Sequence, residues 1–263
     1  MRRLSFLGVL FAAALGLTTA FAQPQVSAGG ILDGAGFVVG QAVAPGSVVS
    51  IFGSGLATSL LLGDTIPLSA NIGGTQVTMN GIPAPLYFVS GGQVNAQVPW
   101  NVLTQGTTGT ANVIVSVNGV ASSPQSVNVG PFSPNMFSSG NTGIAINPDG
   151  SLAAPVGSIP GLPTRPARAG EVLILLANGL GAVDGPIANG APGNPLRNNT
   201  TVPVVLIGGV GANVLFSGLS PQFPGINQLN VVVPNGVTGN AVPLQLRVGG
   251  ITSSDKVVIA VGP

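Results

Sequence analysis

Short runs of alternating apolar and polar side chains follow one another along the chain after residue 23. Turn residues, above all Gly, Pro and Asn-Gly, interrupt these runs at intervals of roughly 8–15 residues, and no 3.6-residue period is sustained. Many short strands with such spacing are typical of a sandwich or barrel, so the pattern predicts an all-β protein. The clearest predicted strands are Ser47–Phe52, Thr75–Met79, Gln93–Val98, Ala111–Val117, Glu171–Leu176, Val202–Ile207, Gln228–Val233 and Val242–Val248.

Similar sequence segments, each predicted to contain a strand, occur twice along the chain in the same order. The segment GSVVSIFGSGL (46–56) matches GEVLILLANGL (170–180), and GIPAPLYF (81–88) matches GVGANVLF (209–216). Two further matches, around the phrase Q-x-N-x-x-V-P and around the last hairpin, keep this order. Four collinear matches indicate a duplicated unit whose loops differ in length.

Each copy has about the size of an immunoglobulin-like sandwich. We therefore predict two tandem β-sandwiches, the first at residues 23–131 and the second at 132–263. The second unit is expected to begin with a connecting segment and a hairpin at 144–154, whose turn lies at Asn147–Gly150.

The first 22 residues have the pattern of a secretory signal peptide. Arg2 and Arg3 precede the apolar stretch Leu4–Leu17, and Ala20-Phe21-Ala22 is a small-x-small cleavage site. Cleavage before Gln23 predicts a secreted or cell-surface protein, with the periplasm as the alternative, and without a membrane span in the mature chain.

Charge is scarce throughout the sequence. The chain has seven Lys or Arg and six Asp or Glu, and loss of Arg2 and Arg3 leaves a net charge of about −1. No basic stripe is present to neutralise phosphates, which argues against nucleic acid as a partner. The absence of Cys means that apolar burial must hold the fold without disulfides.

The repeated phrase places Gln93, Asn95 and Pro99 in copy one and Gln228, Asn230 and Pro234 in copy two. The Gln and Asn of each copy point to one face of a strand, and the Pro ends ladder pairing. We interpret the pair as structural: its amides are expected to hold a neighbouring loop. The alternative is a ligand-binding amide pair.

The inventory of reactive side chains argues against an enzyme. The chain has no His and no Cys, so the usual Ser-His and Cys-His pairs and zinc ligands are absent. The acidic residues are dispersed, and most are expected in turns, as for Asp33-Gly34 and Asp149-Gly150. We predict no catalytic residue, no metal site and no cofactor.

Trp100, the only Trp, directly follows Pro99. Asn235 stands at the corresponding place in copy two, so the sandwich itself does not need this Trp. Packing between the two copies, local packing and stacking on a sugar ring remain open. In the last case Trp100, Gln97 and Asn101 are the candidate ligand-binding residues. Tyr87, which corresponds to Leu215, is expected in the core.

The chain also resembles a known family. GSVVSIFGSGLA resembles the opening of IPT/TIG-type, E-set-like immunoglobulin domains. VAPGSVVSIFGSGLA, GGQVNAQVPWNV, RAGEVLILLANGLG and LFSGLSPQFPGINQLNVVVP are similar to the Solibacter-type C-terminal domain family of secreted acidobacterial proteins. This resemblance covers nearly all of residues 30–260 and implies fold and location, but no activity.

Two functions are compatible with these features. The first is a non-catalytic secreted or cell-surface module for attachment, assembly or protein interaction, including interaction with itself. The second is an extracellular carbohydrate-binding protein that uses Trp100, with envelope or extracellular polysaccharide as its partner.

Overall fold

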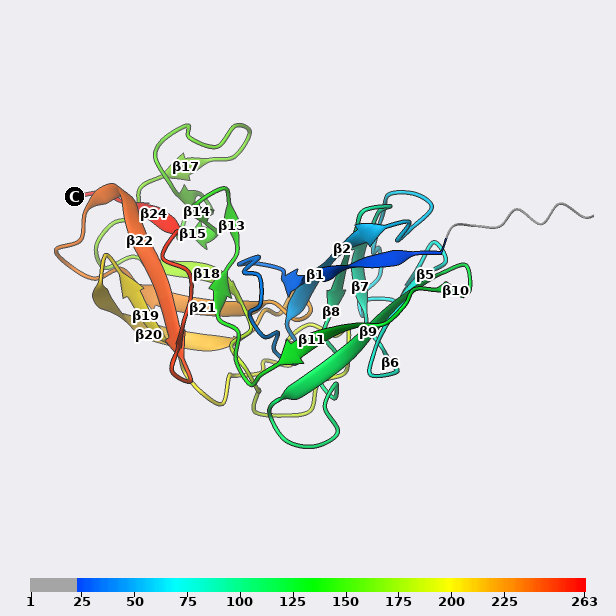
Figure 1. Ribbon diagram of the computed structural model, residues 1–263. Helices are drawn as coiled ribbons and strands as arrows, with labels where there is room; N and C mark the ends of the chain where they lie inside the picture. The colour runs from blue at the N-terminus through cyan, green and yellow to red at the C-terminus, as the bar shows by residue number, and fades with distance from the viewer. Residues whose placement is uncertain (1–22) are drawn as a thin grey trace, which may run out of the picture.

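The computed structural model describes residues 23–263. The predicted signal peptide at residues 1–22 lies outside the described residues. Figure 1 shows two lobes side by side, the N-terminal one in blue to green and the C-terminal one in green to red. The described residues form strands, bridges and turns and contain no helix, which confirms the all-β class.

The first lobe, domain 1, contains two sheets. One has the strand order β1-β2-β8-β7-β3, and the other has the order β10-β9-β5-β4, with β11 paired to β9 and β6 to β5. Their bounds are β1 Gln25–Asp33, β2 Val48–Ser54, β3 Leu61–Leu62, β4 Asn71–Ile72, β5 Thr75–Met79, β6 Ile82–Pro83, β7 Leu86–Val89, β8 Gln93–Gln97, β9 Gly109–Val117, β10 Val120–Ala121 and β11 Gln125–Val129.

The second lobe, domain 2, repeats this plan, but its two layers are joined through one long strand. That strand, β20, pairs with β19 over its first part and with β21 over its second. The bounds are β12 Asn135–Met136, β13 Ser138–Ser139, β14 Thr142–Gly143, β15 Ala145–Ile146, β16 Leu152–Ala153, β17 Thr164–Arg165, β18 Val172–Asn178, β19 Val204–Ile207, β20 Val210–Leu219, β21 Asn227–Val232, β22 Gly239–Val248, β23 Ile251–Thr252 and β24 Val258–Val261.

Each domain has its own apolar core. Strand β9 shows the reason: its alternate residues Ala111, Val113, Val115 and Val117 are buried, while the residues between them are more exposed. One cluster of buried residues spans Val26 to Val129 and the other spans Met136 to Val261. The fold is therefore two tandem β-sandwiches of the immunoglobulin-like type, as the duplicated strand pattern predicts.

The duplication extends to individual backbone hydrogen bonds. In domain 1 the N–H of Gly46 donates to Val98 O at 2.9 Å, and the N–H of Val98 donates to Ser47 O at 2.8 Å. In domain 2 Gly170, Val233 and Glu171 form the same two bonds, both at 2.9 Å. The repeated sequence therefore encodes a repeated closure at the start of β2 and of β18.

The predicted hairpin at 144–154 is present. Strands β15 and β16 pair antiparallel at Ile146 and Leu152, and the N–H of Gly150 donates to Asn147 O across the turn. Strand β15 also pairs with β18, so this hairpin extends the main sheet of domain 2.

Candidate functional site: the joint and the cleft between the domains

A buried amide from domain 2 hydrogen-bonds to the first residue of β2 in domain 1, at the edge left open beyond the end of β1. The side chain of Asn178, at the end of β18, donates from Nδ2 to Val48 O at 2.7 Å and accepts from the N–H of Val48 at 2.9 Å. The same Nδ2 donates to the Asp33 carboxylate, also at 2.7 Å. Asn178 and Asp33 are fully buried. The amide thus stands in for a neighbouring strand, and we call this set of contacts the joint.

A second group of contacts lies beside Gln97, which is also fully buried. Its Nε2 donates to Gly46 O at 3.1 Å, and its Oε1 accepts from the N–H of Gly190 in domain 2 at 2.6 Å. The N–H of Leu68 donates back to Gly190 O at 2.9 Å. Gln97 therefore connects the start of β2 to a loop of the other domain.

Trp100 is half-buried next to this group. Its backbone N–H donates to Oδ1 of Asn189 in domain 2 at 2.8 Å, and Nδ2 of Asn189 donates to Asn101 Oδ1 at 3.2 Å. The Trp100 ring lies against Gly46 so closely that a Cβ there would be 2.2 Å from the ring. Among the described residues the indole Nε1 is buried and has no hydrogen-bond partner.

An apolar cleft of about 440 Å³ opens between the domains at this Trp. Within residues 23–263 no charged side chain lines it, and Thr107 and Thr200 contribute hydroxyl groups. Its lining comes from both domains and from the connecting segment: Pro45, Trp100, Leu103, Gly106, Thr107, Pro131, Phe132, Ala182 and Thr200.

The three candidate ligand-binding residues have different surroundings. Trp100 lines the cleft, but both polar atoms of the Gln97 amide are already hydrogen-bonded inside the protein. Asn101 is exposed, and its amide oxygen accepts from Asn189. The amides near Trp100 therefore bind one another and the backbone rather than facing the cleft.

The repeated Gln and Asn residues bind each other. In β8, Nε2 of Gln93 donates to Asn95 Oδ1 at 2.8 Å, and in β21 Gln228 donates to Asn230 at 2.9 Å. Asn95 also accepts from the Ser50 hydroxyl of the neighbouring strand β2. The expected contact with a neighbouring loop is thus replaced by a pair along one strand.

Pro99 and Pro234 each follow the last ladder residues of their strands. Pro99 comes two residues after β8, and Pro234 comes two residues after β21. In each case the preceding Val, Val98 or Val233, makes the last backbone bonds to the start of the neighbouring strand. The Pro then directs the chain into a loop, because it has no N–H to continue the ladder.

The expected core position of Tyr87 is wrong. Tyr87 and Leu215 occupy corresponding bulges, where the ladder register shifts between Leu86 and Phe88 and between Val214 and Phe216. A bulge turns its extra side chain out of the regular alternation. Tyr87 is half-buried at the domain interface, where its hydroxyl donates to Pro224 O, and Leu215 is 57% exposed.

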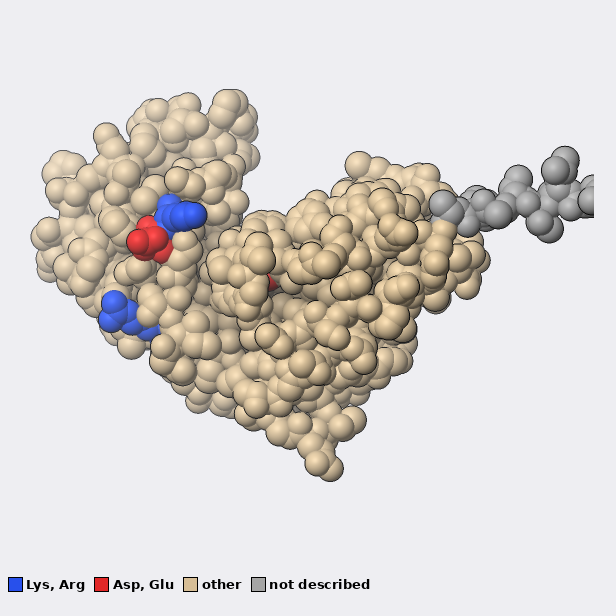
Figure 2. Space-filling model, viewed as in Figure 1, with Lys and Arg blue, Asp and Glu red and all other residues tan. Residues whose placement is uncertain are grey.

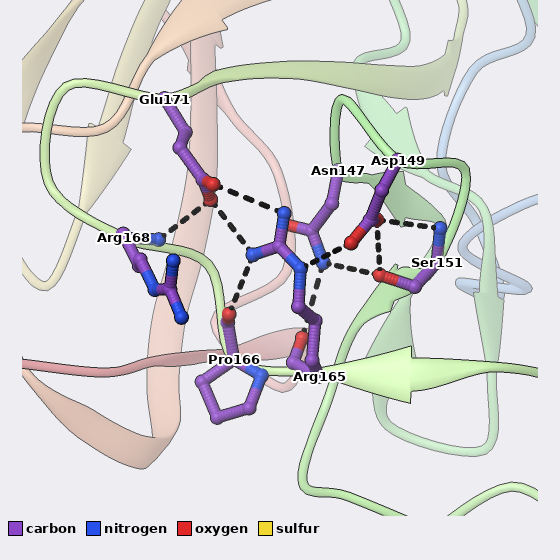
Figure 3. Close-up of polar contacts among 7 residues, drawn as sticks. All are labelled: Asn147, Asp149, Ser151, Arg165, Pro166, Arg168 and Glu171. Atoms are coloured by element: carbon purple, nitrogen blue, oxygen red, sulfur yellow. Dashed lines mark hydrogen bonds and ion pairs between the residues drawn. The ribbon is translucent and has the colours of Figure 1, made fainter.

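The face of domain 2 seen in Figure 2 carries few charged side chains, at two separate places. Figure 3 shows that the Arg165 guanidinium lies between two carboxylates: Nε contacts Asp149 at 2.5 Å, and the two terminal nitrogens contact Glu171 at 2.9 and 3.0 Å. Asp149 also accepts from Ser151 within the hairpin turn. This cluster connects the hairpin, β17 and the start of β18.

Four carboxylates have pKa values shifted by their surroundings. Hydrogen bonds from Arg165 lower the pKa values of Asp149 and Glu171, and hydrogen bonds from Asn198 lower that of Asp184. Burial raises the pKa of Asp33 to about 6, against the opposing hydrogen bonds from Gly36, Ala35, Asn178 and Asn135. Asp33, however, has no exposed surface through which a substrate could reach it.

Residues 23–263 contain neither a candidate metal site nor a candidate membrane-spanning helix. This part of the chain holds no group of three or more Asp, Glu, His or Cys side chains suited to a metal ion. It also has no helix of the length and apolarity required to cross a bilayer.

Asn178 and Asp33 are the joint residues that sequence reasoning missed. Asp33 is in a turn as expected, where it accepts from the N–H groups of Ala35 and Gly36, but its second oxygen faces domain 2. Asn178 corresponds to Ser54 in domain 1. The sequence signal for Asn178 is that the polar residue at this strand end differs between the two copies. A single sequence does not show which residue such a side chain contacts.

Comparison with known proteins finds distant structural likenesses. No protein-family model matches the sequence, and no curated protein matches it either. Similar solved structures include SGBP-B of the Bacteroides ovatus mixed-linkage glucan utilization locus, in complex with a mixed-linkage heptasaccharide. It has 11% identity and a TM-score of 0.36, over 85% of this chain and 45% of that one.

Two others are the plexin A4 extracellular region and the C-terminal domain of the AgI/II polypeptide BspA of Streptococcus agalactiae. The plexin match has 13% identity and a TM-score of 0.28, over 97% of this chain and 20% of that one. The BspA match has 9% identity and a TM-score of 0.21, over 89% and 98%. The chain thus spans less than half of the length of SGBP-B and of plexin A4, and we draw no functional conclusion from these matches.

Proposed function

We propose that this protein is a non-catalytic extracellular module that binds a partner, and that it belongs to the Solibacter-type family which its sequence resembles. The observation that carries the proposal is the cleft at Trp100, which is built by both domains and lined by uncharged, mostly apolar side chains. Such a cleft can bind a ligand, but it offers no acid, base or nucleophile pair. The N-terminal sequence pattern supports secretion.

The hydrogen bonds between the two domains support a binding role, because they hold the two walls of the cleft in place. Asn178, Gln97 and Asn189 each connect the two domains through hydrogen bonds. A cleft with fixed walls loses less conformational entropy when a ligand binds.

The proposal is tested by incubating purified protein with envelope from its own cells and with a panel of insoluble polysaccharides. We expect saturable retention on one of these materials, with no soluble sugar or peptide released over time. Catalytic release of product would overturn the non-catalytic assignment, and no retention on any material would overturn the binding role.

A second candidate is carbohydrate binding at Trp100, favoured by the position of this half-buried ring in the cleft wall. A Trp ring can stack on the apolar face of a sugar. The test is the same retention assay with Trp100→Ala, and with Phe223→Ala as a matched control because Phe223 is an aromatic residue that is 42% exposed and does not line the cleft. Loss of glycan retention in folded Trp100→Ala alone supports this site; equal retention by both variants rejects it.

A further inference from the structure

Asp33 is a buried carboxylate at the joint and forms no ion pair with any residue in 23–263. Its Oδ1 accepts from the N–H groups of Ala35 and Gly36, at 2.9 and 2.8 Å, and its Oδ2 accepts from Asn178 at 2.7 Å. The fit is tight, since a Cβ on Gly36 would lie 2.4 Å from the Asn135 side chain. The negative charge is therefore stabilised by neutral donors alone.

The groups that face Asp33 come from every element packed against it. They are Asn178 on β18, Asn135 on β12 and the start of β2 at Val48; Gln41 in turn contacts Asn135. Lys256 lines a neighbouring pocket of about 160 Å³ together with Gly36 and Asn135. Lys256 is exposed and is not among the groups that shift the titration of Asp33.

Opening the joint would bring water to this carboxylate. An ionised carboxylate is far better solvated in water than in a buried site, whereas a protonated one loses much less on burial. Ionisation of Asp33 therefore favours the open joint, and protonation favours the closed one. We propose that the joint is a pH-sensitive latch, held more firmly in mildly acidic surroundings and loosened as Asp33 ionises.

The direction agrees with the titration of this group. Burial raises the pKa of Asp33 to about 6, compared with 3.8 for the exposed side chain. The state with the higher pKa binds the proton more tightly, so protons stabilise the closed joint. The effect is present below the pKa of the exposed group and is lost as the pH rises through about 6.

Hydrogen exchange at one amide reports the latch directly. The N–H of Val48 bonds to Asn178 across the joint, whereas the N–H of Val98 bonds to Ser47 inside domain 1. Exchange of both amides in the full protein would be measured by NMR and corrected for the intrinsic rate at each pH. Between about pH 5 and about pH 7.5 we expect the opening constant at Val48 to rise roughly tenfold while that at Val98 stays constant.

Two variants and one direct titration decide the proposal. Asp33→Asn should abolish the pH dependence at Val48, and Asp149→Asn, an exposed carboxylate outside the joint, should retain it. An unchanged opening constant in the wild type, or a pH dependence that persists in Asp33→Asn, would overturn the latch. If Asp33→Asn does not fold, the carboxyl of Asp33 is titrated by NMR in the wild type. A pKa near its ordinary value then rejects the proposal, and a raised one together with the change at Val48 supports it.

Discussion

The Asn178 side chain acts as a strand neighbour for Val48. A backbone segment at this edge would offer one donor and one acceptor, and the amide offers the same pair with a second N–H for Asp33. All three partners are buried, but only the N–H of Val48 has this amide as its one partner; Val48 O also accepts from Gly34, and Asp33 also accepts from Ala35 and Gly36. This one side chain thus makes three of the hydrogen bonds that connect the two sandwiches.

We expect Asn178→Ala to lower the free energy of unfolding by about 3 kcal/mol, since it leaves the buried N–H of Val48 without a partner and removes one hydrogen bond each from Val48 O and the Asp33 carboxylate. Urea denaturation of the variant measures this loss. Asn198→Ala is the control, because Asn198 donates to Asp184 at the exposed surface. Equal stability of the two variants would contradict the role assigned to Asn178.

At the scale of elements, a similar turn precedes β2 and β18, but different residues pack against it in the two domains. Gly46 and Gly170 both have positive φ, +79° and +82°. The Trp100 ring covers Gly46, whereas a Cβ on Gly170 would have no atom within 4 Å. In both copies the backbone requires a residue that adopts positive φ. Only in domain 1 does a neighbouring side chain also leave no room for a Cβ.

This difference gives a paired prediction. Gly170→Ala should cost about 1 kcal/mol, the usual strain of a non-Gly residue with positive φ. Gly46→Ala should cost clearly more, because the added methyl also displaces the Trp100 ring. Thermal unfolding of both variants, followed by far-UV circular dichroism, compares them. Equal losses would mean that the ring moves aside without cost.

At the scale of the whole molecule, the two domains place their corresponding ends in different surroundings. The Asp33 end of domain 1 is covered by domain 2, while the corresponding end of domain 2, at Asn147, is occupied by the hairpin turn and the ion pairs of Arg165 (Figure 3). Most of the remaining visible surface is uncharged (Figure 2). Stability is therefore expected to respond to pH through few groups.

The carboxylates differ in whether a fall in pH raises or lowers the stability of the protein. Asp33, with a raised pKa, adds stability as the pH falls from about 7 to about 4. Asp149, Glu171 and Asp184, with lowered pKa values, contribute stability above their ordinary pKa values that is lost in stronger acid. We expect the melting temperature to be highest in mild acid, between about pH 4 and about pH 6. A maximum at pH 7 or above would contradict the raised pKa of Asp33.

The sequence by itself determined the all-β class, the duplication and the hairpin at Asn147–Gly150. Period-two alternation, turn residues and repeated text are local features that act within a few residues of each other. The tertiary structure alone decided the roles of Asn178, Gln97 and Tyr87, because the partners of these side chains lie in the other domain, far along the chain. Both copies carry polar residues at strand ends, but the docking of one domain on the other decides which of them becomes buried.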